Sequence, residues 1–177
     1  IWFTDPVFGI LGNYEGHKSD PELPQCVYRV DGDSGAVSIV ADDILGPNGL
    51  CFSPDESILY IVQSRGEPHR NILAYDVTEN GADIANKRIF IDAGPDGTPD
   101  GMRCDIDGNL WCGWGMGSAD LDGVMVYAPD GTRIGRIALP ERCANVCFGG
   151  VKRNRLFMAA SQSLYALYVN TQGVAGG

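Results

Sequence analysis

Three residues with side-chain oxygens recur at equivalent places in the sequence and could together hold a cation. Asn48, Asp100 and Asn145 each precede a short apolar run, and they lie 52 and 45 residues apart. A hard cation such as Ca²⁺ prefers amide and carboxylate oxygens and takes about six to eight of them, waters included. Asn-Gly and Asp-Gly are also common turn pairs, so each residue taken alone could serve only to satisfy backbone groups. Their recurrence in register favours a shared site.

These residues belong to a repeated unit of short strands. In each unit a leucine paired with an aromatic residue opens the next strand 10 or 11 residues after the Asn or Asp. A third strand with a tyrosine motif follows, and two units continue into a fourth strand, over 88–91 and 134–137. Four short antiparallel strands in about 45 residues are typical of a β-propeller blade.

The first residues of the chain fit the same repeat as part of a further unit. Ile1 and Trp2 match the leucine-aromatic pair, and residues 27–29 and 37–40 match the third and fourth strands. We therefore predict an all-β fold in which residues 1–177 form a single, incomplete β-propeller domain of about three and a half to four blades. Because no start methionine or leader precedes Ile1, we expect the C-terminal part of a longer protein, of about 300 residues if it has six units. A stack of β-sheets in a sandwich is the alternative fold.

A propeller would bring the three oxygen-bearing residues together. The first strand of each blade lines the central channel, so residues that enter this strand face one shared opening. Asn48, Asp100 and Asn145 all enter such a strand. The repeat thus predicts a divalent metal site in the channel, with Ca²⁺ as the expected ion and Zn²⁺ or Mn²⁺ as alternatives.

Composition restricts the partners of the chain. It carries 23 acidic residues against 13 Lys plus Arg, a net charge of −10, without a basic cluster that could follow a phosphate backbone. No apolar run approaches the ~20 residues of a membrane helix. We therefore expect neither a nucleic-acid nor a membrane partner.

The cysteines bear on the compartment. No C-x-x-C pair occurs, and Cys143 lies at a strand entrance. The other five alternate with apolar residues inside predicted strands, so we interpret them as buried thiols, which weakly favours the cytoplasm over the periplasm. These five are Cys26, Cys51, Cys104, Cys112 and Cys147. Any signal peptide would precede Ile1, so the localisation itself is not predicted.

An insertion at residues 5–24 interrupts the turn between two strands of the first unit. It carries Glu15, His17 and Lys18, and from this position it could form a lid over the mouth of the channel. Glu15 and His17 are therefore candidate substrate-binding residues. Polar-loop histidines are otherwise ordinarily exposed to solvent. With two histidines and no G-x-S-x-G elbow, the sequence offers no serine-hydrolase triad.

Four sequence blocks together resemble the gluconolactonase, senescence-marker-protein and luciferin-regenerating-enzyme family over essentially the whole chain. They begin at Trp2, Pro47, Pro99 and Asn145, and the insertion is similar to that of the bacterial and fungal gluconolactonase branch. The resemblance implies a six-bladed propeller with one divalent metal held by a Glu, two Asn and an Asp. Asn48 matches one Asn ligand, and Asp100 matches the Asp that also serves as proposed base. The Glu and the second Asn would precede Ile1.

The resemblance also changes the expectation for Asn145, which does not match a usual metal ligand of the family and becomes a candidate channel or substrate contact. The implied reaction is hydrolysis of a sugar-acid lactone, with the metal as Lewis acid on the carbonyl oxygen and Asp100 as ligand and base. Two alternatives remain: a propeller that only binds a ligand or a protein, and another channel-metal hydrolase of aryl esters or phosphotriesters. The partner expected is a small lactone, together with self-association or pairing with a missing N-terminal part.

Overall fold

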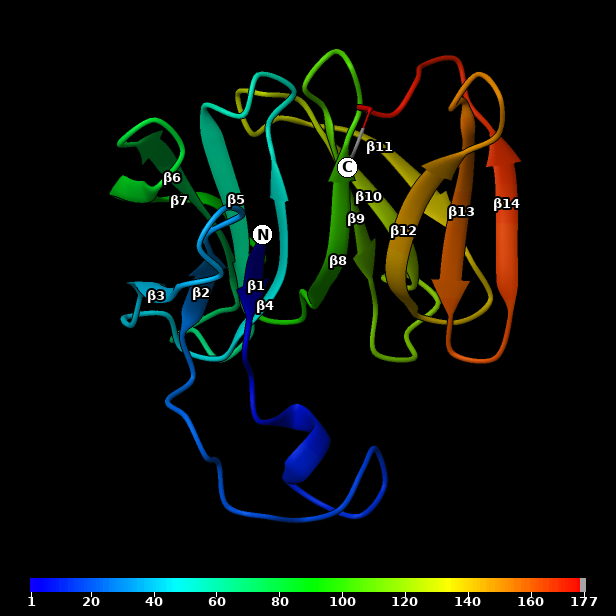
Figure 1. Cartoon of the computed structure of the whole chain (residues 1–177). Coiled ribbons are helices and arrows are strands. Elements are labelled where there is room, and N and C mark those ends of the chain that lie inside the picture. Colours follow the sequence, from blue (N-terminus) through cyan, green and yellow to red (C-terminus); the bar gives the residue numbers. More distant parts are fainter. Residues whose placement is uncertain (176–177) are drawn as a thin grey trace.

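Short apolar runs separated by glycine, proline and aspartate turns fold into four antiparallel sheets in the computed structural model, which describes residues 1–175. Each sheet follows the order of the chain and is called a blade here (Figure 1). The first blade contains β1 (Trp2–Thr4), β2 (Val27–Val30) and β3 (Val37–Ala41), and the second contains β4 (Pro47–Phe52), β5 (Ile58–Gln63), β6 (Asn71–Thr78) and β7 (Asp83–Asp92). The third contains β8 (Pro99–Cys104), β9 (Leu110–Trp114), β10 (Gly123–Tyr127) and β11 (Arg133–Ala138), and the fourth contains β12 (Cys143–Gly149), β13 (Arg155–Ala160) and β14 (Leu164–Tyr168).

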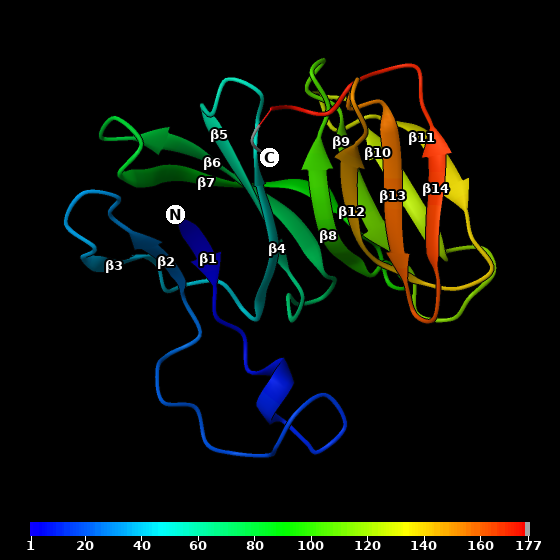
Figure 2. The ribbon, with the colours of Figure 1, turned by 45° about the vertical axis from the view of Figure 1, so that its right-hand side comes forward.

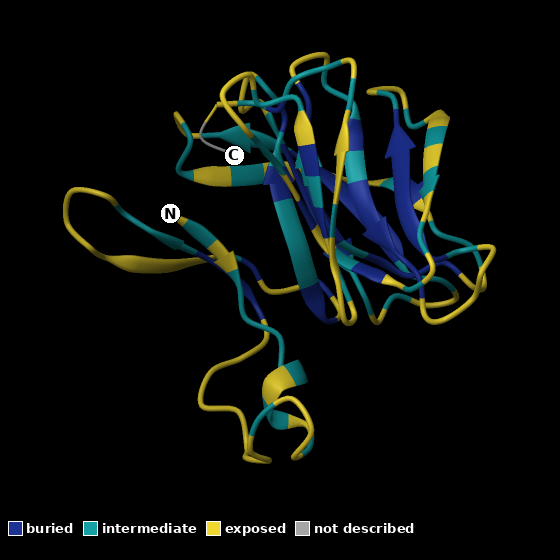
Figure 3. Ribbon diagram, turned by 90° about the vertical axis from the view of Figure 1, so that its right-hand side faces the viewer, coloured by how far each residue is buried: buried dark blue, intermediate teal, exposed yellow. Residues whose placement is uncertain are grey.

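The hydrophobic cores lie between neighbouring blades, because each sheet buries its apolar faces against the next sheet. One cluster joins the first and second blades, another the second and third, and a further one the third and fourth. Figure 3 shows the buried segments concentrated in the middle strands, while the outer strands β3 and β7 are largely exposed. The blades are therefore held in a row by side-chain packing, and the inner strands β4, β8 and β12 run side by side (Figure 1).

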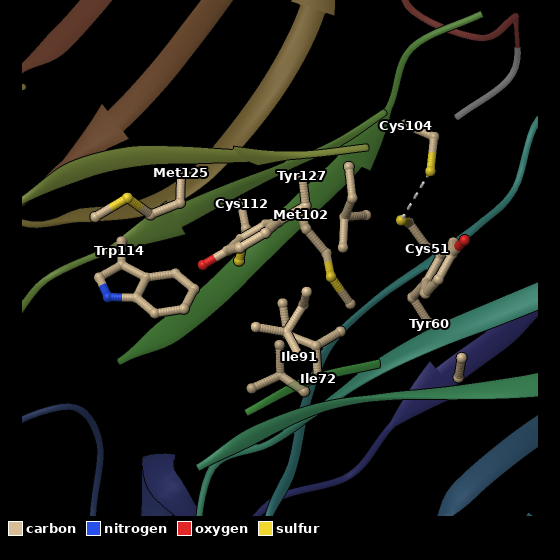
Figure 4. Close-up of a cluster of buried hydrophobic side chains, with 13 residues drawn as sticks. Cys51, Tyr60, Ile72, Ile91, Met102, Cys104, Cys112, Trp114, Met125 and Tyr127 are labelled. Carbon is tan, nitrogen blue, oxygen red and sulfur yellow. Dashed lines mark hydrogen bonds between the residues drawn. The ribbon is translucent and has the colours of Figure 1, made fainter. Parts of the chain in front are cut away.

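Two cysteines meet inside the largest cluster. The sulfur atoms of Cys51 on β4 and Cys104 on β8 lie 3.9 Å apart (Figure 4). All six cysteines are free thiols, and five of them are buried. The prediction of a buried thiol was wrong for Cys147, which is exposed because its side chain points away from the cluster that covers Val146 and Leu156.

The turn after β8 is built around a buried carboxylate. Asp105 is fully buried and accepts hydrogen bonds from the backbone N–H groups of Asp107 and Asn109 and from Trp111 Nε1, at 3.0, 2.9 and 2.9 Å. This network satisfies the buried carboxyl oxygens of Asp105 and fixes the entry into β9.

The residues after β14 return to the centre of the molecule. Figure 2 shows this segment crossing the end of the fourth blade toward the ends of β8 and β4. The backbone N–H of Ile106 donates to Gln172 at 2.9 Å, and that of Gly173 donates to Arg153 at 2.8 Å. The segment thus ties the fourth blade to the third.

The architecture confirms the all-β prediction and the expected number of blades in this chain. The predicted third and fourth strands are present, although β7 begins at Asp83, earlier than the predicted 88–91. None of the helical segments within residues 1–175 is long and apolar enough to cross a membrane.

Candidate active site

The second residues of two neighbouring inner strands contact each other. Asn48 on β4 donates from Nδ2 to Oδ1 of Asp100 on β8, at 2.9 Å. The 52 residues between them form the rest of the second blade, so the contact depends on the packing of two blades. The prediction that these two residues converge is confirmed by this hydrogen bond.

Glycine makes this contact possible. A Cβ atom at Gly49 would overlap the backbone carbonyl oxygen of Asp100, and one at Gly101 would overlap the side-chain amide of Asn145. Neither glycine has a positive φ angle, and both lie inside strands rather than in turns. The Asn-Gly and Asp-Gly pairs are therefore not turn signals here. The glycine leaves room for the next blade.

The backbone of Asn48 has a second support. The hydroxyl of Thr4, at the end of β1, donates to the carbonyl oxygen of Asn48 at 2.9 Å. The first blade thus fixes the start of β4, and the side chain of Asn48 is directed toward Asp100 by neighbours on both sides.

The environment of Asp100 raises its pKa above the ordinary value. Burial is the main cause, and the nearby charge of Glu15 acts in the same direction. The hydrogen bond from Asn48, the positive charge of Arg142 and the backbone N–H of Gly101 partly offset this effect. A carboxylate with a raised pKa is a better proton acceptor than an exposed aspartate.

Asp100 and Asn48 line a hollow of about 530 Å³. Its walls come from the starts of β4 and β8, from residue Arg142 before β12, and from three loops. These loops connect β1 to β2, β5 to β6 and β9 to β10, which are equivalent connections in the first three blades. Their common position explains the hollow, because each returns the chain to the end of the blade at which the inner strand begins.

The insertion between β1 and β2 contributes one wall. It contains a short 3₁₀ helix, η1 (Phe8–Ile10), and projects beyond the start of β4 (Figure 1). The guanidinium of Arg65 lies 5.5 Å from the centre of the Phe8 ring, which anchors the insertion to the β5–β6 loop. Glu15 lines the hollow, whereas His17 is exposed and is not among the lining residues.

Asn145 lies near the site but does not line the hollow. It is the third residue of β12, and its Oδ1 accepts from the backbone N–H of Val146 at 2.9 Å. Its amide group packs over Gly101, directly after Asp100. Among the candidate residues, the structure therefore brings Asn48, Asp100 and Glu15 to one hollow.

Three arginines in this hollow have no counterpart in the sequence analysis. Arg65 and Arg70 lie on the β5–β6 loop, and Arg142 precedes β12. They stand outside the repeated Asn and Asp positions, so the repeat does not single them out. The strand order is a signal for Arg65 and Arg70, since the loop between the second and third strands of each blade must return to the same end as Asn48.

The donor set fits a hard divalent cation in type. The amide oxygen of Asn48 and the carboxylate of Asp100 are adjacent oxygen donors, and both residues are half-buried. They would supply two of the about six to eight oxygen ligands that Ca²⁺ takes, so a calcium site would need further oxygens. Within residues 1–175, no group of three or more His, Cys, Asp and Glu side chains is placed to hold a metal.

Residues 1–162 match the family described as SMP-30/Gluconolactonase/LRE-like region. The chain belongs to this family. A gluconolactonase of Zymomonas mobilis is 31% identical over 182 residues, which covers 98% of this chain and 48% of the relative. The resemblance seen in the sequence is thereby confirmed.

Solved structures of the family have the same fold. A gluconolactonase from Xanthomonas campestris superposes with a TM-score of 0.81 at 36% identity, covering 94% of this chain and 52% of that one. A calcium-binding protein from Agrobacterium tumefaciens, named regucalcin, gives a TM-score of 0.70 at 25% identity, covering 85% and 54%. These matches confirm the predicted propeller fold. The chain spans about half the length of the relatives that it matches.

Proposed function

We propose that the protein carrying this chain hydrolyses a sugar-acid lactone in the hollow lined by the four blades of this chain. The observation that carries the proposal is the hydrogen bond between Asn48 and Asp100, which holds a half-buried carboxylate at the wall of the hollow. The fold around this hollow is that of a family that includes gluconolactonases. The hollow, of about 530 Å³, accommodates a ligand the size of a sugar lactone.

In this proposal Asp100 acts as the general base. It accepts a proton from the water that attacks the lactone carbonyl carbon, the ring C–O bond breaks, and the proton passes to the ring oxygen to give the hydroxy acid. Burial supports this role because it raises the pKa of Asp100. Asn48 Nδ2 donates to Oδ1 of Asp100 at 2.9 Å. This hydrogen bond fixes the orientation of the carboxylate.

Asn48 and Asp100 would also hold a divalent metal ion. When bound, the metal polarises the lactone carbonyl oxygen and acidifies water. The calcium-binding relative supports Ca²⁺ as the ion, with Zn²⁺ and Mn²⁺ as alternatives. Ligation leaves Asp100 able to accept a proton only if one carboxylate lone pair remains free.

The insertion at residues 5–24 closes the hollow as a lid in this proposal, and Glu15 contacts the substrate from it. His17 and Asn145 act at the border of the site: His17 from the exposed part of the insertion, and Asn145 by supporting the backbone next to Asp100.

The test is replacement of Asp100 by Asn or Ala in the full-length protein. We expect loss of gluconolactone hydrolysis with an unchanged far-ultraviolet circular dichroism spectrum, because Asn preserves the shape and removes the charge. The matched control is Asp130→Asn, in the exposed turn between β10 and β11, which should stay within about twofold of the parent. Retention of more than about a tenth of the activity by Asp100→Asn would exclude the base role.

A further inference from the structure

Three guanidinium groups line the same hollow as Asp100. They belong to Arg65, Arg70 and Arg142. The chain has 13 Lys and Arg residues and a net charge of −10, so three positive side chains in one hollow contrast with its overall acidity.

None of the three is neutralised by an ion pair within residues 1–175. The four ion pairs there join Arg29 to Asp31, His69 to Asp92, Lys87 to Asp43 and Arg88 to Asp76, all outside the hollow. Arg70 is half-buried, whereas Arg65 and Arg142 are exposed at the rim of the hollow, so all three guanidinium groups can be reached by a ligand that enters it.

The protein contacts of the three groups are weak. Arg65 stacks on Phe8 at 5.5 Å, Arg70 Nη1 donates to the Gly97 carbonyl at a long 3.5 Å, and Arg142 Nη1 lies 3.9 Å from the Met116 sulfur. Each guanidinium has about five N–H donors, so most of them remain available in the hollow.

The local charge favours an anion. The carboxylates that line the hollow belong to Glu15 and Asp100, against the three arginines, and a divalent metal would add further positive charge. The planar fork of a guanidinium group matches phosphate, sulfonate and carboxylate groups.

The arginines divide the hollow into two ends. Arg142 precedes β12 of the fourth blade, which packs on β8, the strand that carries Asp100, whereas Arg65 and Arg70 lie together on the β5–β6 loop of the second blade. A ligand whose reacting carbon faces Asp100 can therefore extend toward Arg65 and Arg70.

We propose that the preferred substrate is a sugar lactone with an anionic group remote from the lactone carbonyl, and that Arg65 and Arg70 bind this group. The inference rests on the proposed lactone hydrolysis and adds the substrate class. Phosphate, sulfonate and carboxylate share the required chemistry. Arg142 sits at the reacting end, beside Asp100.

The kinetic test compares gluconolactone with phosphogluconolactone and glucaric acid monolactone as substrates of the full-length protein. We expect kcat/KM to be at least about tenfold higher for one of the charged lactones, since a hydrogen bond to a charged group contributes more than a neutral one. In Arg70→Met, kcat/KM for the charged lactone should fall about tenfold to a hundredfold, and kcat/KM for gluconolactone should fall by a clearly smaller factor. Comparison of the two charged lactones distinguishes phosphate from carboxylate.

Arg133→Met is the matched control, because it removes an exposed arginine of β11 outside this hollow. It should leave all substrates unchanged. Arg70→Lys should recover part of the preference, since it restores the charge without the planar fork. Equal kcat/KM values for charged and neutral lactones, with equal losses in the arginine variants, would overturn the inference while leaving lactone hydrolysis intact.

Calorimetric titration with phosphogluconate and with gluconate gives a readout besides activity. We expect Arg70→Met to weaken phosphogluconate binding at least about tenfold and gluconate binding much less. If no lactone is hydrolysed but this difference is observed, the anion site stands and the proposed reaction is wrong. If phosphogluconate binds no better than gluconate to the parent protein, the anion site is wrong.

Discussion

At the scale of single residues, the site depends on one amide that reaches across a blade boundary. Asn48 donates to Asp100 with one amide atom and keeps its oxygen available, while Thr4 holds its backbone. The same side chain therefore orients the carboxylate and offers a neutral oxygen ligand. Removal of this amide should affect both functions together.

We expect Asn48→Ala to weaken divalent metal binding by about tenfold to a hundredfold without a change in fold, because it removes one oxygen ligand and the partner of another. Titration of the full-length protein with Ca²⁺, Zn²⁺ and Mn²⁺ measures the effect. Asn80→Ala, in the exposed turn between β6 and β7, is the control. Unchanged dissociation constants for all three ions would leave Asn48 with a purely structural role.

The sequence could predict which residues of the inner strands converge, because Asn48 and Asp100 occupy the same step of a repeat. The repeat does not single out Arg65, Arg70 or Arg142. Two of these residues lie on a loop and one lies just before a strand, and the pairing of the strands determines where they are placed. Because the loops of different blades differ in length, their residues do not recur at a fixed spacing in the sequence. Asn145 shows the converse: it keeps the register of the repeat, yet its Oδ1 accepts from the backbone N–H of Val146 and the residue does not line the hollow.

At the scale of elements, the close approach of β4 and β8 is permitted by the missing side chain at Gly49. The carbonyl of Asp100 occupies the space that a Cβ atom would need. Any larger residue must move β8 away from β4, and Asp100 moves with it.

We expect Gly49→Ala to destabilise the protein by about 1–3 kcal/mol and to lower activity by about a hundredfold, since displacement of a reacting group by about 1 Å has an effect of this size. Urea denaturation and a lactone assay measure the two effects. Gly135→Ala on β11 is the control, because its Cβ would lie at an ordinary 3.6 Å from Val126. Wild-type activity in Gly49→Ala would show that the two strands can separate without consequence.

The turn between β4 and β5 is stabilised by a carboxylate. Asp55 Oδ1 accepts from Ser53 Oγ, from Ser57 Oγ and from the backbone N–H of Ser57, at 2.7, 2.7 and 3.1 Å. These hydrogen bonds lower the pKa of Asp55 to about 2. Because the pKa is lower in the folded chain than in the unfolded one, ionised Asp55 stabilises the fold at neutral pH, and this contribution is lost as the pH falls toward about 2.

We expect Asp55→Asn to be less stable than the parent protein at neutral pH. The difference in stability between the two proteins should become smaller as the pH falls from about 4 to about 2. Urea midpoints at several pH values, with the exposed Asp42→Asn as control, test this. If the difference in stability between Asp55→Asn and the parent protein were the same at every pH, the lowered pKa of Asp55 could not be the cause of the stabilisation.

At the scale of the whole molecule, the outer face of the fourth blade is open. Within the described residues β14 pairs with β13 alone, and Leu164, Leu167 and Tyr168 are 71%, 45% and 70% exposed. An exposed apolar edge strand is a template for pairing with another chain.

We therefore expect the 177-residue chain on its own to self-associate and to lack appreciable lactone hydrolysis, since it supplies two of the expected metal ligands. Sedimentation combined with a lactone assay measures both properties. Leu164→Lys with Leu167→Lys should reduce the association by placing charges on the edge. A stable, active monomer would contradict both the edge argument and the placement of the remaining ligands outside this chain.

The two inner-strand glycines also give the row of blades a direction. Gly49 accommodates Asp100 of the following blade and Gly101 accommodates Asn145, but the corresponding residue of the fourth blade is Val146. Blades of this chain are therefore not interchangeable modules: transplanting the fourth blade in front of the third would set an isopropyl group against the backbone of Asp100. Circular permutation keeps every neighbour in place and is compatible with this packing, whereas recombination that shuffles blades is not.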